Sequence, residues 1–421
     1  MFGMKDKDLY QQILGITTPW FVKEVDLNIE KQQVTIFVEY KGNGACPECG
    51  TECNTHDHRE RQWRHLDTCQ MKTILSAKVP RVNCKEHGVK QVSVPWAESK
   101  SRFTALFEAL VIDWLMEASV SAVSTQLRLT WDEVDGIRGR AVARGLERRA
   151  SYPVKDLGVD ETSYQKHHEY VTIITDQNNG TVLEVLEDRK KETLCSFLET
   201  MGKENLMAIQ SFSMDMWPAF IEAVKENLPN ADEKICFDRF HISQHLGKAV
   251  DKVRAKEHKE FIKAHGESPL LRTKHDWLKN SERVDNRTRR WFMELTKSNL
   301  KTARAWAMKE SVGKLWHYNS RRWAEKKWKY AIQWMRRSRL PAMVKVGKTI
   351  KDHLWGILNA VTLGKTNAIA ESKNAQIQKV KRMACGFRNR SRFREAILFH
   401  LGGLDLYPST ARNLTPSHPK T

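Results

Sequence analysis

The chain has 421 residues, with 70 Lys and Arg against 51 Asp and Glu, and its formal net charge of +19 corresponds to a pI of about 9.5. This length allows roughly two to four domains and a sizeable core. The charge favours a polyanionic partner, because each Lys or Arg that pairs with a phosphate releases a counterion, although a merely basic soluble protein would have the same balance. No apolar run reaches the roughly 18 residues of a membrane helix. Residues 1–10 contain charges instead of an apolar signal core, so we expect a soluble, cytoplasmic protein with no membrane partner.

The N-terminal region, residues 1–98, is predicted to be a small β-rich domain. Residues 4–15 have the pattern of a short helix. Residues 25–40 alternate apolar and polar side chains around a polar turn, which is typical of a β-hairpin. Residues 71–82 and 91–96 indicate further strands.

Two pairs of potential metal ligands lie in this region. Cys46 and Cys49 are separated by two residues and followed by Gly, and Cys84 and His87 repeat both the spacing and the Gly. Such a Cys₃His set suits tetrahedral Zn²⁺, and four protein ligands leave no open position, so we expect a structural zinc. Ordinary reduced cysteines would leave the matched pairs unexplained, and eight cysteines in a chain of this size do not indicate a disulfide scaffold. Cys53 could replace one ligand but has no partner at the right spacing. For five nearby residues we expect structural or solvent-facing roles: Cys53, Cys69, His56, His58 and His65.

Residues 103–150 have helical periodicity and are predicted to form a helix-turn-helix DNA-binding domain. A helix is expected over residues 120–129, and Thr130 is expected to cap a second helix that has two acidic residues in its first turn. The second helix is basic, as expected of one that enters the major groove, although a plain helical linker explains the same pattern. Its candidate DNA-binding residues, which we expect to point away from the apolar face, are Arg138, Arg140 and Arg144.

Residues 151–242 predict a mixed α/β sheet, the first part of a domain that we expect the chain to complete after residue 360. The expected strands are Lys155–Asp160, Tyr170–Thr175, Val182–Asp188, Met207–Asp215 and Lys234–Phe237. The expected helices are Glu192–Met201 and Pro218–Asn227. In a sheet of this order the first and fourth strands are neighbours.

Residues 243–360 are helical in pattern, charged and rich in tryptophan, and we expect a helical insertion domain. Eight of the fourteen tryptophans lie there: Trp277, Trp291, Trp306, Trp316, Trp323, Trp328, Trp334 and Trp355. Most are expected to be core residues, whereas basic pairs on the outer face would contact phosphates, namely Arg321, Arg322, Arg336 and Arg337. Residues 361–406 are expected to complete the sheet domain with a helix starting near Ala368. Residues 407–421 are expected to be a disordered tail.

Three carboxylates are the candidate catalytic residues. Asp160 and Asp215 each end an apolar run that predicts a strand, and Glu371 opens a run with helical spacing. Three such carboxylates can hold two divalent metals about 4 Å apart, and Mg²⁺ or Mn²⁺ suits their oxygens. Glu161 is expected to point away from Asp160 by strand alternation.

The helix that carries Glu371 is predicted to be amphipathic. Glu371 shares one face with three polar residues, which we regard as candidate DNA-binding residues: Asn374, Gln378 and Arg382. The opposite face carries Ile369, Ile377, Val380 and Ala384. Lys373 falls on that apolar face, which this arrangement does not explain.

Other acids also end predicted strands, and a strand-end Asp is often a cap or turn residue. The rivals are Asp176, Asp188 and Asp238. Asp238 and His241, three residues apart at a strand-to-helix turn, are candidate auxiliary residues. They could orient a phosphate or the carboxylates, or they could form a buried ion pair that holds the turn.

Several motifs together, spread over nearly the whole chain, carry a family resemblance. The N-terminal motifs are the two metal-ligand pairs, with Arg64-His65-Leu66-Asp67 between them. The later motifs are Val159-Asp160-Glu161, Ser213-Met214-Asp215-Met216-Trp217, Phe237-Asp238-Arg239-Phe240-His241, Glu371-x₂-Asn374-x₂-Ile377 and Gly386-Phe387-Arg388-Asn389. In these residues the chain resembles the DDE transposases of bacterial insertion sequences, specifically the ISL-three (ISL3) family.

The resemblance implies an RNase H-like catalytic domain that a helical insertion interrupts, and the triad Asp160, Asp215 and Glu371. It implies that Asp238 and His241 form the family's D-x₂-H element, and that the finger and the helix-turn-helix bind the terminal inverted repeats. His87 stands where the family's finger commonly has a cysteine, which puts the zinc affinity in doubt. The expected activity is cleavage and transfer of double-stranded DNA by a homodimer or higher oligomer in the bacterial nucleoid.

Two other functions compete with this interpretation. One is a zinc-dependent DNA-binding regulator that has lost its chemistry, against which the complete triad argues. The other is an RNase H-like nuclease or junction resolvase, which would not need both a finger and a helix-turn-helix.

Overall fold

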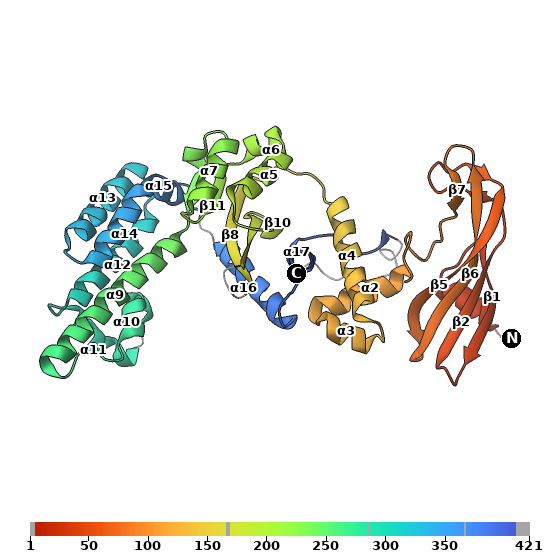
Figure 1. Cartoon of the computed structure of the whole chain (residues 1–421), viewed down its shortest axis with the longest axis horizontal. Helices are drawn as coiled ribbons and strands as arrows, with labels where there is room; N and C mark the ends of the chain where they lie inside the picture. The colour runs from red at the N-terminus through yellow and green to blue at the C-terminus, as the bar shows by residue number, and fades with distance from the viewer. Residues whose placement is uncertain (1–4, 166–168, 285, 366–367, 410–421) are drawn as a thin grey trace. The chain divides into compact units, whose positions relative to one another are not determined.

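The computed structural model describes residues 5–165, 169–284, 286–365 and 368–409, and the chain forms two compact units (Figure 1). Unit 1 contains the described residues up to Arg149 together with those from Leu404 onward. Unit 2 is Ala150–Gly403. Each unit is described by itself. None of the described helices combines the length and the apolar character needed to cross a membrane.

Unit 1 begins with a twisted sheet in the strand order β1-β2-β6-β5, with β7 paired to β6. Its elements are α1 (Asp6–Ile13), β1 (Trp20–Asn28), β2 (Gln33–Tyr40), β3 (Gly44–Ala45), β4 (Glu52–Cys53), β5 (Thr55–Thr68), β6 (Met71–Cys84) and β7 (Gly88–Gln91). The short helix, the β1–β2 hairpin and the strand from Met71 are confirmed. The expected strand over 91–96 is wrong, because β7 ends at Gln91.

The core of this sheet is built on three tryptophans. Trp96 packs edge-on against Trp20 and Trp63, with ring centroids 4.9 and 5.4 Å away. Each ring is at least nine-tenths buried, and aromatic residues of this size dominate the burial energy of a small domain.

Helices complete unit 1. They are α2 (Ala105–Glu117), α3 (Val120–Gln126) and α4 (Trp131–Glu147). Thr130 caps α4 as predicted: its side chain accepts a hydrogen bond from the Glu133 amide, and the Glu133 side chain accepts one from the Thr130 amide. The expected disorder from residue 407 is wrong for Tyr407, whose hydroxyl donates to Asp113 Oδ1 at 2.6 Å. Residues 410–421 of the expected tail lie outside the described residues.

Unit 2 contains a mixed sheet in the order β10-β9-β8-β11-β12. The elements here are β8 (Asp156–Gln165), β9 (Glu169–Asp176), β10 (Thr181–Leu186), α5 (Lys191–Met201), α6 (Lys203–Ala208), β11 (Ser211–Met214), α7 (Pro218–Asn227), α8 (Ala231–Lys234) and β12 (Ile235–Phe237). Strands β8, β9 and β10 pair antiparallel, whereas β8, β11 and β12 pair parallel. The predicted contact between the first and fourth strands is therefore confirmed. The helix α6 occupies residues that the sequence had assigned to the start of the fourth strand.

Gly158 of β8 allows close packing beside the site. A Cβ atom there would lie 1.8 Å from Gln177 Nε2 and 2.7 Å from Thr175 Oγ1, so both side chains would have to move. The glycine therefore lets Gln177 and Thr175 fold over β8 two residues before Asp160.

Helices follow β12. They are α9 (Arg239–His265), α10 (Lys274–Leu278), η1 (Ser281–Arg283), α11 (Asn286–Thr296), α12 (Lys301–Gly313), η2 (Lys314–His317), α13 (Arg321–Arg337), α14 (Pro341–Asp352), α15 (Leu354–Thr362), α16 (Ala368–Met383) and α17 (Arg390–Leu401). Residues 239–362 contain no strand in their described part, as predicted. Trp277, Trp306 and Trp328 are core residues, whereas Trp291, Trp323 and Trp334 are exposed.

The chain returns from these helices to the sheet through α15 and the segment after it. The Asn359 side chain donates to Asp232 O at 2.8 Å and to Ile235 O at 2.9 Å. Lys365 Nζ lies 2.7 Å from Asp156 Oδ2 at the start of β8. These contacts tie the end of the helical region to the sheet.

Candidate active site and zinc centre

The four predicted zinc ligands converge. Cys46 Sγ lies 3.8 Å from His87 Nδ1, Cys49 Sγ lies 3.7 Å from Cys84 Sγ, and Cys84 Sγ lies 3.6 Å from His87 Nδ1. A tetrahedral zinc with Zn–S bonds of about 2.3 Å requires S···S edges of about 3.8 Å. The set therefore has the size of a zinc site, and within the described residues it is the only group of three or more such side chains whose ligand atoms all lie within 4.8 Å.

Local backbone geometry explains why the ligands converge. Gly50 and Gly88, which follow the two ligand pairs, have φ angles of +72° and +67°, a conformation that favours glycine. The outer nitrogen of His87, Nε2, lies 3.5 Å from Glu48 Oε2, an arrangement that orients a metal-binding imidazole.

The other cysteines and histidines of this region do not join the set. Cys53 Sγ lies 3.3 Å from Thr51 O, Cys69 is exposed, and His56 lies beside Asp57. His65 is buried and its Nδ1 lies 2.9 Å from Thr104 Oγ1. Burial, followed by the charge of Arg64, lowers the pKa of His65 to about 4, so this imidazole is neutral at pH 7.

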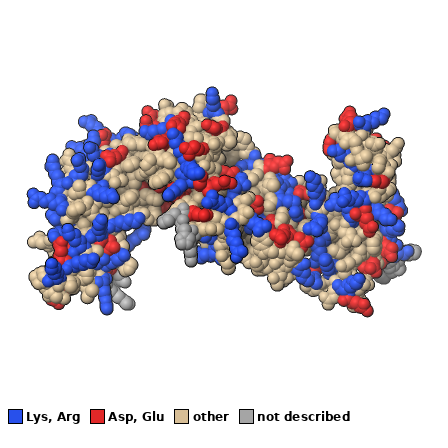
Figure 2. Space-filling model, in the orientation of Figure 1, with Lys and Arg blue, Asp and Glu red and all other residues tan. Residues whose placement is uncertain are grey.

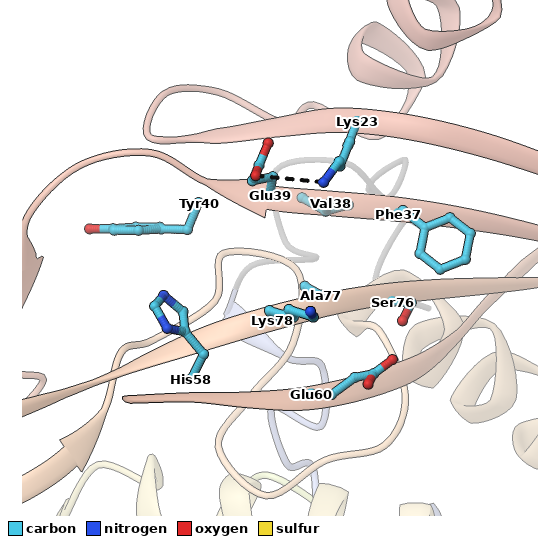
Figure 3. Close-up of a pocket in the computed structure, with 10 residues that line it drawn as sticks. All are labelled: Lys23, Phe37, Val38, Glu39, Tyr40, His58, Glu60, Ser76, Ala77 and Lys78. Carbon is cyan, nitrogen blue, oxygen red and sulfur yellow. Dashed lines mark ion pairs between the residues drawn. The ribbon is translucent and has the colours of Figure 1, made fainter. Parts of the chain in front are cut away.

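His58 lies instead on the outer face of the sheet, in a cavity of about 310 Å³ (Figure 3). Lys23 and Glu39 approach one another across β1 and β2, with 3.8 Å between Nζ and Oε1. Glu60 and Lys78 line the opposite side. Two lysines face two glutamates, so the cavity lacks the excess positive charge that phosphate binding requires.

The arginines of α4 are engaged in unit 1 itself. Arg138 and Arg144 are 5% and 7% exposed, so the expectation that they point away from the core is wrong. Arg138 pairs with Asp135, and Arg144 Nη2 lies 2.6 Å from Glu98 Oε2 and 3.0 Å from Glu108 Oε2. Arg140, which is half-buried, also pairs with Glu108, at 2.6 Å. The pairs of Arg140 and Arg144 hold α4 against its neighbours, whereas the Arg138–Asp135 pair lies within α4.

In unit 2, the structure places the three candidate catalytic carboxylates around β8. Asp160 lies within β8, and Asp215 follows the last residue of the adjacent parallel strand β11. Glu371 lies in the first turn of α16. The amides of Glu161 and Trp217 donate to Asp160 Oδ1 at 2.8 Å and to Asp215 Oδ1 at 3.0 Å, which orients both aspartates.

Helix α16 is attached to β8 by the polar face that carries Glu371. Asn374 Nδ2 donates to Asp160 Oδ2 at 2.6 Å, and Gln378 Nε2 donates to Thr162 Oγ1 at 2.9 Å. Lys381 Nζ continues the series with a 2.8 Å bond to Ser163 O.

These contacts bring Glu371 to the same strand as Asp160. They also assign Asn374 and Gln378, predicted as DNA-binding residues, to contacts within the protein. Of the face expected to be apolar, Ile377 and Val380 are buried, whereas Ala384 is exposed.

Burial and mutual repulsion raise the pKa values of these acids. Burial, with added repulsion from Asp238 and Asp215, raises the pKa of Asp160 to about 6. Burial also raises the pKa of Asp215, and burial with the charge of Asp238 raises that of Glu371. His241 opposes all three shifts electrostatically, so its imidazole lies among the carboxylates.

Two further residues lie beside this site, and neither was assigned a role from the sequence. Burial and the charge of Asp215 raise the pKa of Glu161, which was expected to point away from Asp160. Arg189 Nη1 lies 3.5 Å from Glu161 Oε2, and its guanidinium packs over the rings of Tyr170 and Trp217 at 5.0 and 4.9 Å. Arg189 lies in the loop between β10 and α5, and no feature of the sequence distinguishes it from an ordinary charged loop residue.

The rival strand-end acids have structural contacts. Asp176 accepts hydrogen bonds from the amides of Asn178 and Asn179, and Asp188 accepts one from the Thr193 hydroxyl at 2.6 Å. Asp238 caps α9, where its Oδ1 accepts from the Phe240 amide, and its own amide donates to Met214 O on β11.

Asp238 thereby also lies close to the carboxylates. His241 Nε2 is 3.9 Å from Asp238 Oδ2. Both alternatives considered for this pair, the structural and the auxiliary one, are compatible with that position.

The outer arginines of the helical region divide into two groups. Arg321 Nη1 donates to Asn359 Oδ1 at 2.9 Å and so holds α13 to α15. Arg322, Arg336 and Arg337 are exposed. Arg382 at the end of α16 is exposed as well.

The donor set of the carboxylate site suits a hard divalent cation. Its groups are carboxylate and amide oxygens, the ligands that Mg²⁺ prefers. Glu161 Oε1 and Asn374 Oδ1 are buried acceptors without a hydrogen-bond partner in the described part of the chain. The three carboxylates are spaced more widely than the zinc ligands, since no acidic set among the described residues brings three oxygens within 4.8 Å.

Most of the chain is similar to known proteins. Residues 157–397 match the model of a family described as transposase, DDE_Tnp_ISL3. Residues 42–87 match a zinc-finger of the transposases IS204, IS1001, IS1096 and IS1165, and residues 92–137 match the helix-turn-helix domain of transposase family ISL3.

Two similar curated proteins are also transposases. The transposase for insertion sequence element IS1557 of Mycobacterium tuberculosis is 26% identical over 427 residues, which cover 92% of this chain and 93% of the relative. The transposase for IS1001 of Bordetella parapertussis is 23% identical over 353 residues, 83% of this chain and 86% of the relative.

Proposed function

Because the chain belongs to the ISL3 family of transposases, we propose that it binds the terminal inverted repeats of an insertion sequence and cleaves and transfers its DNA strands. The single observation that carries the chemistry is the attachment of α16 to β8, which brings Glu371 to the strand of Asp160 beside Asp215. In this proposal Asp160, Asp215 and Glu371 are the DDE triad.

The triad would hold Mg²⁺ or Mn²⁺, which activates a water or 3′-hydroxyl and stabilises the leaving oxygen of a phosphodiester. Asn374 positions Asp160 through its hydrogen bond, and the amides of Glu161 and Trp217 keep both aspartates oriented. The carboxyl of Asp160, with a pKa near 6, must lose its proton before its oxygens can bind a cation strongly.

We assign the mixed sheet to an RNase H-like catalytic domain, divided between residues 151–242 and 361–406 by a helical insertion of residues 243–360. The parallel pairing of β8 with β11, after the antiparallel β8–β9–β10 strands, supports this assignment. Residues 1–98 would form the zinc-binding domain and residues 103–150 the helix-turn-helix domain.

The proposed substrate is double-stranded DNA, comprising the element ends and the target. The net charge of +19 and the matches to a zinc finger and a helix-turn-helix support DNA binding. Assembly as a homodimer or higher oligomer on DNA, in the bacterial nucleoid, is part of the same proposal.

Cleavage of a duplex that carries an element end tests the triad. We expect Asp160→Asn, Asp215→Asn and Glu371→Gln each to reduce Mg²⁺-dependent cleavage by at least about a hundredfold, because the metals need anionic oxygens. Binding of the same duplex should persist in all three variants. The matched control is Asp188→Asn, which changes a strand-end acid with a structural contact.

Substantial cleavage by any one triad variant would remove that residue from the triad. Cleavage of arbitrary DNA at a rate equal to that of the element end would favour a nuclease instead. Binding without cleavage by the unmodified protein would favour a regulator.

A further inference from the structure

Helix α13 carries a stripe of exposed aromatic and basic side chains. The stripe contains Trp323, Lys326, Lys327, Tyr330, Trp334 and Arg337. At about 100° per residue these positions fall within an arc of roughly 100° on one side of the helix. Trp323, Tyr330 and Trp334 are 54%, 70% and 38% exposed, so the rings are available to a partner.

The core of the helical region does not require these rings. The other side of α13 is buried and consists of Ala324, Trp328, Ala331, Ile332 and Met335. Large aromatic side chains exposed in a row, rather than singly, are typical of a binding surface. Core packing therefore does not account for the exposed rings, whereas a binding partner would.

The charges around the rings indicate the kind of partner. Lys326 packs over the Trp323 ring at 5.3 Å, and within the described chain no ion pair joins Lys326, Lys327 or Arg337 to a carboxylate. Glu325, the acidic residue of α13, pairs with Lys329 on another side of the helix. Figure 2 shows Lys and Arg side chains gathered around the part of unit 2 where α13 lies.

We propose that this stripe binds an unpaired DNA strand, whose bases stack on the three rings and whose phosphates pair with the three cations. Aromatic rings interleaved with basic residues are the usual means of binding single strands without sequence preference. From Trp323 to Trp334 the stripe spans about 16 Å, and this length matches roughly five nucleotides at the ~3.4 Å spacing of a stacked strand. A duplex would hide its base faces from the rings, and a second copy of this basic surface would be repelled.

The inference rests on the proposed function, since cutting DNA at an element end produces strand ends that can unpair. It concerns a different surface from the triad, however, and can be measured by binding alone. The two proposals can therefore fail separately.

Binding of the full-length protein to a labelled oligothymidylate of about 15 nucleotides, followed by fluorescence anisotropy, tests the stripe. Each ring replaced by Ala should weaken binding on the order of tenfold, and the triple variant Trp323→Ala, Tyr330→Ala, Trp334→Ala by more than about a hundredfold. The triple Phe variant should retain affinity within about threefold, because Phe still stacks. The matched control is Trp291→Ala, a 47% exposed tryptophan on α11 outside the stripe.

Three results would overturn the inference. The triple Ala variant could bind the single strand as tightly as the unmodified protein, or the triple Phe variant could lose as much single-strand affinity as the triple Ala variant. The triple Ala variant could also lose as much affinity for the matched duplex as for the single strand. Dissociation of an oligomer by the triple Ala variant, seen by sedimentation, would instead identify a second copy as the partner. Asp160→Asn should bind the single strand as tightly as the unmodified protein, because Asp160 lies outside the stripe. If the unmodified protein binds the single strand but does not cleave an element end, the proposed function is contradicted and the inference about the stripe is not.

Discussion

Replacement of Asp160 by Asn should stabilise the metal-free protein while it abolishes cleavage. The pKa of Asp160 is raised from 3.8 to about 6, first because of burial and then because of repulsion by Asp238 and Asp215. The carboxylate is therefore less stable in the folded chain than in the unfolded one. Asn keeps the shape but has no charge. Its Oδ1 can accept from the Glu161 amide, and its Nδ2 can donate to Asn374 Oδ1, a buried acceptor without a partner among the described residues, if the Asn374 amide turns over.

The shift sets the expected size of the effect. A rise from 3.8 to about 6 is about two pKa units, and at 1.36 kcal/mol for each unit the ionised form costs roughly 3 kcal/mol on folding, as an upper bound. Below about pH 4 the carboxyl is protonated in both states and the cost vanishes. Between about pH 4 and 6 the unfolded chain releases its proton first, so stability falls as pH rises, and above about pH 6 the full cost is present.

The assay is urea unfolding of both proteins from pH 4 to pH 8 with chelator present. The advantage of Asp160→Asn should grow between about pH 4 and 6 and then stay constant at roughly 1–3 kcal/mol. Mg²⁺ should restore stability to the unmodified protein but far less to the variant, because a ligand of the folded state stabilises it by mass action. A variant that is less stable at pH 8, or an advantage that does not change with pH, would refute the reasoning.

Three further predictions concern other parts of the chain. Cys49→Ser should lose the bound zinc and unfold the N-terminal sheet, because the energy of metal binding contributes directly to folding there. Metal analysis and circular dichroism of the purified variant would show both losses. Purified unmodified protein that contains no zinc would contradict the prediction. Arg144→Ala should destabilise unit 1 by about 3 kcal/mol, because it leaves Glu98 and the buried Glu108 without this partner. The control Arg102→Ala, which removes an exposed side chain, should change the free energy of unfolding by less than about 0.5 kcal/mol in the same urea assay. Changing Arg322, Arg336 and Arg337 to Ala should weaken binding to many duplexes alike and flatten its salt dependence, and wild-type values in a salt titration would show that the insertion does not contact phosphates.

The sequence predicted those features that depend on local pattern. Periodicity and capping residues located the helices α4 and α7 and most strands of unit 2, and ligand spacing located the zinc set. The strand β5 was missed because most of its N-terminal residues are exposed, so no alternation of buried and polar residues marks it.

Features that depend on distant partners could not be predicted. Arg144 is typical of a basic recognition helix in sequence, and only the fold shows that Glu98 and Glu108 neutralise it. The partner of Arg138, by contrast, is Asp135, three residues away on the same helix. Asn374 was correctly placed on the face of Glu371, but its partner, Asp160, comes from another element.

The position of Glu371 shows how a long insertion is compatible with a fixed site. The chain leaves the sheet at Asp238, whose amide bonds to β11, and it returns at Lys365, which pairs with Asp156 of β8. Both ends of the helical region are thus tied to the sheet within unit 2. The hydrogen bonds of α16 then fix Glu371 against β8. Changes in length or sequence between these two anchors should therefore alter DNA contacts while they leave the carboxylates in place.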